Sequence, residues 1–280
     1  MTIARTEMRN PASMHMYEMS TEEMARLVIS ANYEAVKAVE EAAPAIAAAV
    51  DAIALAFEGG HRLFYVGAGT SGRLGVIDAA ECPPTFGVPY EMVTGIIAGG
   101  KERMFVAGEN EEDKYEHGCR AVEENGVATG DVVVGVSAAG GAAYVVGALE
   151  TAKKLGCITV GLCCNPDTPV LRVSDIPIFT DTGAEVLTGS TRLKAGTAQK
   201  IVLNTFTTCA MAKTGKVYEN MMINLSPSNE KLKKRVVRIV TEILRCEEEK
   251  AISLLEANEW NIRRAVNAAK TEKENAHAEK

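Results

Sequence analysis

RLFYVGAGTSGR, residues 62–73, is the stretch that decides the fold class of this chain. A short apolar run leads into a glycine-rich turn, and a helical stretch leads out of it. Glycines let the backbone turn tightly, so that amide N–H groups face a ligand, and the N-terminus of the following helix favours an anion. The stretch therefore predicts a strand, turn and helix with an anion site at the turn; a tight turn without a ligand is the simpler alternative.

Four further apolar runs follow, at 92–98, 131–136, 158–163 and 176–179, with helical stretches between them. Continuous apolar strands that alternate with helices predict a parallel sheet covered on both faces, which is a doubly wound α/β domain. Ligands of such sheets bind outside the carboxyl ends of the strands. Glycine-rich turns at 67–69, 99–100 and 137–141 lie at three of those ends.

The flanking segments read as helical. Residues 1–19 are irregular, and two helices are expected at 21–39, with Ser20 as N-cap and Glu23 reaching back to it, and at 43–58. A long helix is expected after Gly196, to about Lys213. Ser226-Pro227-Ser228 indicates a boundary. The expected organisation is a domain at 1–225, a small three-helix module at 226–270 and a charged tail at 271–280.

The totals exclude several classes of function. The net charge of -7 and the aromatic content of 5% argue against nucleic acid and anionic lipid as partners. No apolar run is long enough to span a membrane, and the N-terminus has no apolar signal-peptide core. The seven cysteines are expected to be free thiols in a reducing cytoplasm, and the four histidines show no metal-ligand spacing, so no metal is expected.

A nicotinamide cofactor is the obvious competing ligand, because Gly67, Gly69 and Gly72 fit the pattern G-x-G-x-x-G. Thr70 and Ser71, with Arg73 after them, add hydroxyls and a charge where a dinucleotide site usually keeps small residues. Two helices also precede the first strand. These features argue against a dinucleotide, and no cofactor is expected.

Three other segments contain candidate functional side chains. Glu81 precedes Pro83-Pro84 at an expected helix end, where the helix dipole does not favour a carboxylate, which suggests a function; a solvated surface glutamate is the alternative. The acidic run 109–113 is either functional or a solvated helix start. The segment 185–200 gathers hydroxyls and cations at a helix start, which suits a polyhydroxylated anion, or else is an N-capped basic helix.

Six segments, spread in collinear order over nearly the whole chain, resemble the N-acetylmuramic acid 6-phosphate etherase family. They are TEMRNPAS (6–13), GAGTSGRLGVIDAAECPPTFG (67–87), GIIAGG (95–100), GAEVLTGSTRLKAGTAQKIVLN (183–204), GKVYENMMINL (215–225) and NEKLKKRVVRIV (229–240). The resemblance implies a sugar-isomerase (SIS) type domain with a ubiquitin-associated-like helical module, in a cytoplasmic homodimer. The implied reaction, in cell-wall amino-sugar recycling, cleaves the lactyl ether of N-acetylmuramic acid 6-phosphate to N-acetylglucosamine 6-phosphate and D-lactate, without a cofactor.

The resemblance also assigns roles to residues. The acid/base glutamate of the family motif D-A-[SA]-E-C-P-P corresponds to Glu81, and the second glutamate of E-G-A-E-D corresponds to Glu112, although Asn110 and Glu111 here replace the Gly and Ala of that motif. The residues expected to bind the phosphorylated amino sugar are Thr70, Ser71, Gly72, Ser137, Gly140, Ser190, Thr191 and Lys194.

One departure from the family pattern keeps a second function open. The loop that resembles S-A-S-G-R-T-P-Y reads SAAGGAAY at 137–144, so that Ala139, Gly141 and Ala142 replace a Ser, an Arg and a Thr. A lost charge-assisted phosphate contact costs about 1.5–3 kcal/mol. A non-catalytic sugar-phosphate sensor, similar to the glucokinase-regulatory proteins, is therefore the alternative to the enzyme. A phosphosugar isomerase shares the fold but does not explain the segment around Glu81.

Overall fold

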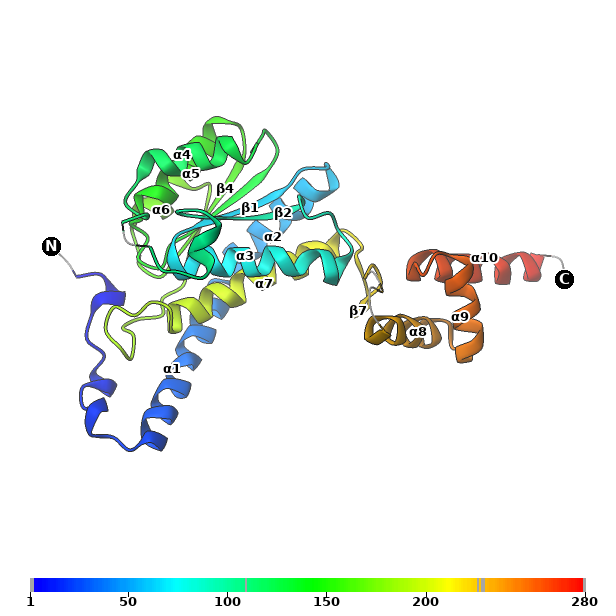
Figure 1. The fold of residues 1–280 in the computed structure, drawn as a ribbon, viewed down its shortest axis with the longest axis horizontal. Helices are drawn as coiled ribbons and strands as arrows, with labels where there is room; N and C mark the ends of the chain where they lie inside the picture. The colour runs from blue at the N-terminus through cyan, green and yellow to red at the C-terminus, as the bar shows by residue number, and fades with distance from the viewer. Residues whose placement is uncertain (1–2, 109, 226, 228–229, 279–280) are drawn as a thin grey trace. The chain divides into compact units, whose positions relative to one another are not determined.

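A five-stranded parallel sheet forms the centre of the first of two structural units (Figure 1). The fold comes from a computed structural model, which describes residues 3–108, 110–225, 227 and 230–278. The strand order is β2-β1-β3-β4-β5, and every adjacent pair is parallel. The strands are β1 (Leu63–Gly67), β2 (Val93–Ile97), β3 (Val132–Val136), β4 (Ile158–Cys163) and β5 (Ile176–Phe179). All five strands predicted for this sheet are confirmed, because each is a continuous apolar run.

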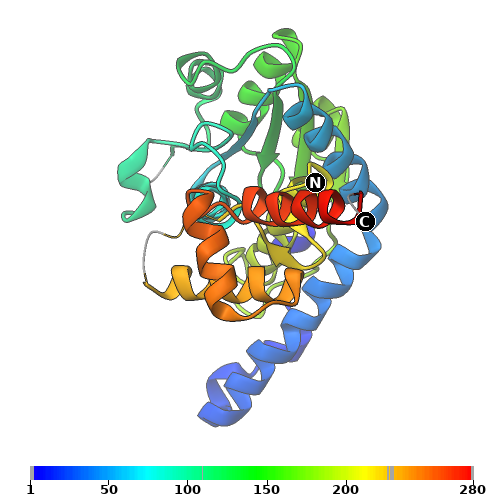
Figure 2. The same cartoon turned by 90° about the vertical axis from the view of Figure 1, so that its right-hand side faces the viewer.

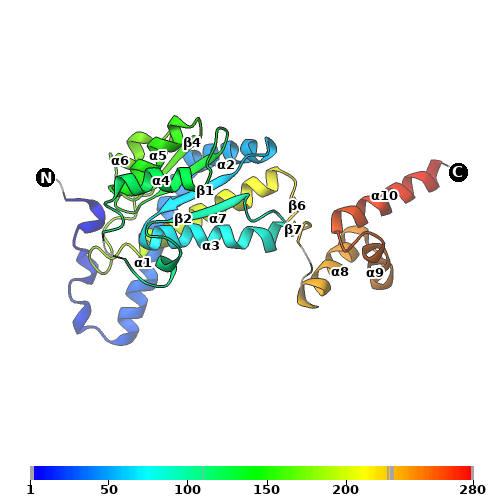
Figure 3. The same cartoon turned by 45° about the horizontal axis from the view of Figure 1, so that its top comes forward.

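Helices cover both faces of the sheet, as the doubly wound prediction requires (Figure 3). On one face, Phe64 and Val66 of β1 share a buried cluster with side chains of α4 and α5. On the other face, the hydroxyl of Tyr65 donates to Asp78 of α3 and to a carbonyl of α7. The helices of this unit are α1 (Thr21–Glu41), α2 (Ala43–Glu58), α3 (Gly69–Phe86), α4 (Tyr115–Glu124), α5 (Ala143–Lys154), α6 (Pro169–Val173) and α7 (Lys194–Lys213), with the 3-10 turn η4 (Lys101–Met104).

The N-terminal segment and α1 reach beyond the sheet (Figures 1 and 2). Helix α1 begins with the predicted capping box between Ser20 and Glu23. Its buried residues all belong to its C-terminal half. Three 3-10 turns precede it, η1 (Arg5–Glu7), η2 (Pro11–Ser13) and η3 (Met16–Glu18). Thr6 is buried and exchanges hydrogen bonds with Asn165, which docks this segment beside the loop after β4.

The expectation that a helix ends before Pro83-Pro84 is wrong. Helix α3 continues through both prolines to Phe86. The prolines lie in its last turn, where they cannot donate to the carbonyls four residues earlier, and the helix ends shortly after them. Gly87 follows with a φ of 61°, and a Cβ there would lie 1.8 Å from the carbonyl oxygen of Asn224, so glycine is required.

The second unit comprises Glu81–Pro89 and Met211–Lys280. It contains the hairpin of β6 (Val217–Tyr218) and β7 (Met221–Met222), which sequence analysis missed because the strands are only two residues long. Helices α8 (Glu230–Leu244), α9 (Glu248–Ala257) and α10 (Ile262–Ala278) form the predicted three-helix module around their own apolar cluster. Helix α10 continues past Lys270, because the next residues include neither Gly nor Pro. The predicted boundary residues Ser226 and Ser228 lie outside the described residues.

Candidate functional site

The turn after β1 can be built only with small residues. A Cβ on Gly67 would lie 2.7 Å from the nitrogen of Gly72, and a Cβ on Gly72 would lie 2.5 Å from the oxygen of Gly67. The end of β1 and the start of α3 therefore touch backbone to backbone. Ser71 is buried in this first helical turn, and its hydroxyl donates to Gln199 Oε1 of α7 at 3.0 Å. This hydrogen bond links the turn to a second helix.

The start of α7 lies next to that turn. A Cβ on Gly196 would lie 3.6 Å from the Thr70 methyl group and 3.6 Å from the carbonyl oxygen of Thr191. Glu185 is fully buried and accepts from the N–H groups of Lys194 and Ala195 at 3.0 and 2.9 Å, which satisfies the open end of the helix. Ser190 and Thr191 lie half-buried just before the helix. Glu185 belongs to the candidate segment 185–200, but its capping role was not predicted, because a cap from outside the helix leaves no local pattern.

The loop after β3 completes this arrangement. Ser137 is buried, and its hydroxyl accepts from the N–H of Gly140 at 3.1 Å. Ala138 of the loop packs with Cys164 and Ala195, the second residue of α7. The structure therefore brings together predicted site residues from three parts of the chain, 70–72, 137–140 and 190–191, around two helix N-termini. This three-loop site combines hydroxyl residues with the N-terminus of α3, which is suited to a phosphate; the N-terminus of α7 is already occupied by the carboxylate of Glu185.

Gln199 belongs to this three-loop site and was not predicted. It is buried, and its Nε2 has no hydrogen-bond partner in the part of the chain that the structure describes. Lys194 was predicted to bind the ligand, but its ammonium group already has a partner within the chain. The group is buried and pairs with Glu34 of α1 at 2.5 Å.

Glu112 lines a separate cavity at the carboxyl ends of β1 and β2. This cavity has a volume of about 330 Å³ and is lined by Ala68, Gly69, Arg73, Ala98, Arg103, Gly108, Asn110, Glu111 and Glu112. Glu112 is exposed, and its carbonyl accepts from the N–H of Tyr144 at 2.9 Å. This hydrogen bond anchors the acidic segment at the start of α5. Glu109 lies outside the described residues.

The neighbouring carboxylate, Glu111, is held by cations. It pairs with Lys114 at 3.0 Å and lies 4.0 Å from His117. The hydrogen bond from Lys114 is the main cause that lowers the pKa of Glu111 below its usual value. Glu111 is therefore an ionised, paired carboxylate, whereas Glu112 has no ion pair among the described residues.

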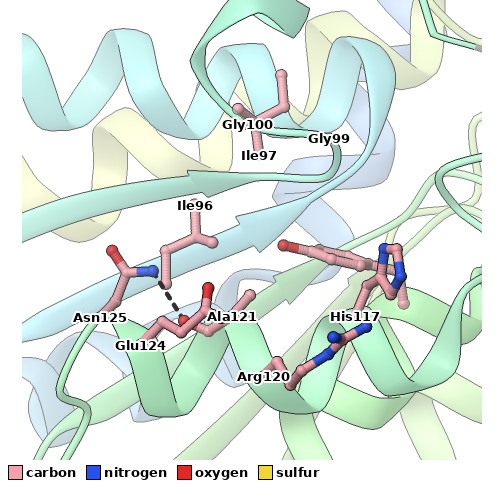
Figure 4. A pocket seen from close by; sticks show the side chains of 10 residues that line it. Ile96, Ile97, Gly99, Gly100, His117, Arg120, Ala121, Glu124 and Asn125 are labelled. Carbon is pink, nitrogen blue, oxygen red and sulfur yellow. Dashed lines mark hydrogen bonds between the residues drawn. The ribbon is translucent and has the colours of Figure 1, made fainter.

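A second cavity of about 370 Å³ lies between the end of β2 and α4. Figure 4 shows His117, Arg120, Ala121 and Glu124 on the α4 side and Ile96 on the strand side. Tyr144 also lines this cavity, and burial raises the pKa of its phenol to about 12, so that the hydroxyl stays protonated at neutral pH. The contact of Glu111 with His117 joins the walls of the two cavities.

Glu81 lies apart from the turn that starts its own helix. It is twelve residues after Gly69 in α3, which corresponds to about 18 Å along the helix axis. Its side chain is exposed. The expectation that it marks a helix end is wrong, because α3 continues to Phe86.

Comparisons with known proteins agree with this architecture. Residues 45–153 match the glucokinase regulatory protein N-terminal SIS domain, and residues 240–269 match a UBA-like domain. A solved structure of the E. coli CFT073 protein c3406 is 17% identical, with a TM-score of 0.51, over 72% of this chain and 97% of that chain. At that identity the likeness concerns the fold alone.

Sequence relatives are much closer. N-acetylmuramic acid 6-phosphate etherase 2 of Vibrio cholerae is 48% identical over 93% of this chain and 85% of its own length. The N-acetylmuramic acid 6-phosphate etherase of Vibrio atlanticus is 46% identical over the same shares, and that of Pasteurella multocida is 47% identical over 90% of this chain and 84% of its own.

Proposed function

This chain belongs to the N-acetylmuramic acid 6-phosphate etherase family, and from that premise we propose that it removes the lactyl group of N-acetylmuramic acid 6-phosphate. The products are N-acetylglucosamine 6-phosphate and D-lactate, so the chain is a carbon–oxygen lyase. The observation that carries this function is the identity of 46–48% over 93% of the chain with relatives of that name. The sensor alternative is not favoured, because the match to the glucokinase regulatory protein covers only residues 45–153.

We assign phosphate binding to the three-loop site. Five residues with hydroxyl groups, Thr70, Ser71, Ser137, Ser190 and Thr191, lie in its three loops. The N-terminus of α3 lies in the first loop and favours a phosphate, whereas the N-terminus of α7 is already capped by Glu185. Gly72 and Gly140 belong to the same loops, and their N–H groups donate to the carbonyl oxygen of Ala68 and to the hydroxyl of Ser137, which fixes the shape of those loops. Since the loop after β3 lacks side-chain donors at Ala139, Gly141 and Ala142, backbone groups and Gln199 Nε2 replace them in this proposal. In this proposal Lys194 contributes to phosphate binding only indirectly: it is the first residue of α7, and its N–H donates to Glu185.

The chemistry requires an acid and a base. A base removes the proton from C2 and the bond from C3 to the ether oxygen breaks, so that lactate leaves with a proton supplied by an acid. Water then adds across the resulting double bond: its oxygen joins C3 and a proton returns to C2. We assign the acid/base role to Glu81 and the assisting role to Glu112, which lines the cavity next to the start of α3. Since Glu81 lies about 18 Å along α3 from that start, we infer that a second copy of the chain completes the active site.

We also infer a homodimer in the cytoplasm. Ile29, Tyr33 and Val36 are exposed on one stripe of α1, at the spacing of an apolar helix face. A second copy of the chain is the partner that we assign to this stripe. Among the described residues, no helix is long and apolar enough to cross a membrane.

The test is an assay for D-lactate with purified protein and N-acetylmuramic acid 6-phosphate. In water labelled with heavy oxygen, the label should appear at O3 of the product sugar, and in deuterated water deuterium should appear at C2. Label in lactate instead would indicate direct displacement rather than elimination. Binding of the sugar phosphate without any release of lactate would favour the sensor.

A further inference from the structure

The side chain of Arg103 lies in a slot between two glycines. Arg103 belongs to the 3-10 turn η4, directly after β2. A Cβ on Gly99 would lie 2.8 Å from its Cγ, and a Cβ on Gly108 would lie 2.6 Å from its Nε. Any larger residue at either position would displace the side chain. The fold therefore keeps space for an arginine at the wall of the cavity that Glu112 also lines.

The Nε atom of Arg103 lacks a fixed partner. It is buried and has no hydrogen-bond acceptor among the described residues. A buried N–H without an acceptor is destabilising, and a bound anion would remove that cost. Arg73, the other arginine of the cavity, differs in this respect, because its Nε donates to the carbonyl of Met104 at 3.1 Å.

The charged side chains that line the cavity are compatible with a bound anion. Two arginines and two glutamates line it. The carboxylate of Glu111 is already paired with Lys114 at 3.0 Å. Glu112 has been assigned a proton-transfer role, in which it is protonated for part of the reaction. The cavity is also lined by Ala68 and Gly69, which belong to the turn that leads to Thr70 and Ser71, so it adjoins the three-loop site.

We propose that Arg103 binds the carboxylate of the lactyl group and so selects sugars that carry it. This inference rests on the proposed function. The substrate has two anions, the phosphate at C6 and the lactyl carboxylate at C3, on different sides of the sugar ring. The three-loop site has the hydroxyl residues and the N-terminus of α3 that suit the phosphate, whereas a planar guanidinium matches a carboxylate with two parallel hydrogen bonds.

The test compares two ligands on one variant, Arg103→Gln. N-acetylglucosamine 6-phosphate keeps the phosphate but lacks the lactyl group, and it serves as a competitive inhibitor. The KM for N-acetylmuramic acid 6-phosphate should rise about tenfold to a hundredfold, the effect of one charge-assisted contact. The inhibition constant of N-acetylglucosamine 6-phosphate should change by less than about twofold. Neither constant depends on the fraction of the enzyme that is folded.

Lys101→Ala is the matched control, because Lys101 is an exposed cation of the same 3-10 turn. It should leave both constants unchanged. Equal weakening of both ligands by Arg103→Gln would assign Arg103 to the phosphate or to the fold and overturn the proposal, as would an unchanged KM. If the native protein binds both sugars but releases no lactate, the proposed function fails; dissociation constants from calorimetry then test the same difference between the two ligands.

Discussion

Single residues set the geometry of the proposed phosphate site. Gly67 and Gly72 let the strand end and the helix start touch, and Ser71 then reaches Gln199 across the gap to α7. The proposed acid/base residues, Glu81 and Glu112, are both exposed and were identified through family motifs. Their roles are therefore best tested by substitutions that keep shape and remove the proton-accepting oxygen.

Glu81→Gln should abolish most turnover and keep binding. The amide preserves size and hydrogen bonding but cannot accept the C2 proton. Release of D-lactate should fall by about two to four orders of magnitude, the span of a general acid–base group, while calorimetry with N-acetylglucosamine 6-phosphate gives a native dissociation constant. A rate equal to that of the native enzyme would mean that the carboxylate is structural.

Asp78 gives a prediction about pH. It accepts hydrogen bonds from Tyr65, Asn204 and Thr207. Burial raises its pKa above the usual value, despite those hydrogen bonds. The folded chain therefore binds this proton more tightly than the unfolded chain, and the contribution of Asp78 to the free energy of unfolding falls as pH rises from about 3.9 through the raised pKa.

Asp78→Asn removes this titration. The difference in free energy of unfolding, native minus variant, should decrease in urea titrations as the pH is raised from about 4. A difference that grows with pH would show that the three hydrogen bonds hold the carboxylate ionised and that burial is the smaller effect.

At the scale of elements, helix starts carry most of the site. Helix α7 is capped by Glu185, but the N-cap residue of α5 is Ala142, which provides no side-chain cap. Ala142 packs against the apolar core, whereas Ala139 of the same loop is exposed. The two alanines that replace hydroxyl residues in this loop should therefore have different effects when the hydroxyls are restored.

Ala142→Ser should act on stability. A serine N-cap accepts from the N–H groups of the first helical turn and raises the free energy of unfolding by about 0.5–2 kcal/mol. Ala139→Ser should leave stability unchanged and tighten binding of N-acetylglucosamine 6-phosphate through one added hydrogen bond, worth about 0.5–1.5 kcal/mol. Urea titrations and calorimetry on both variants separate the effects; the opposite pattern would mean that Ala142 faces the ligand.

At the scale of the whole molecule, α1 is the element that presents an apolar stripe to solvent. Ile29 and Tyr33 are 65% and 74% exposed, and Val36 continues their stripe one turn later. Single exposed apolar residues are ordinary, but a stripe on one helix face indicates an interaction site.

Ile29→Asp combined with Tyr33→Asp should convert dimers into monomers in sedimentation experiments at micromolar concentration, because a charge cannot be buried unpaired in an apolar interface. Ser30→Asp, which places a charge on an exposed position outside the stripe, should remain dimeric. A native protein that sediments as a monomer would overturn the inferred homodimer.

Sequence alone determined the elements whose signal is local. The five strands of the main sheet are continuous apolar runs, and the helix at Ala43–Glu58 matches its predicted bounds because Gly59-Gly60 ends it. The capping box at Ser20 and the family motifs around Glu81 and Glu112 are also local patterns.

Only the tertiary structure decided which of these residues meet. Glu185 caps a helix that starts nine residues later, Gln199 meets Ser71 across 128 positions of sequence, and Gly99 and Gly108 enclose Arg103. The path of α3 through Pro83 and Pro84 was likewise not predicted, because a pair of prolines is a local helix-breaking signal. Such contacts join residues that are not related by any local sequence pattern, so they can be identified only in the folded structure.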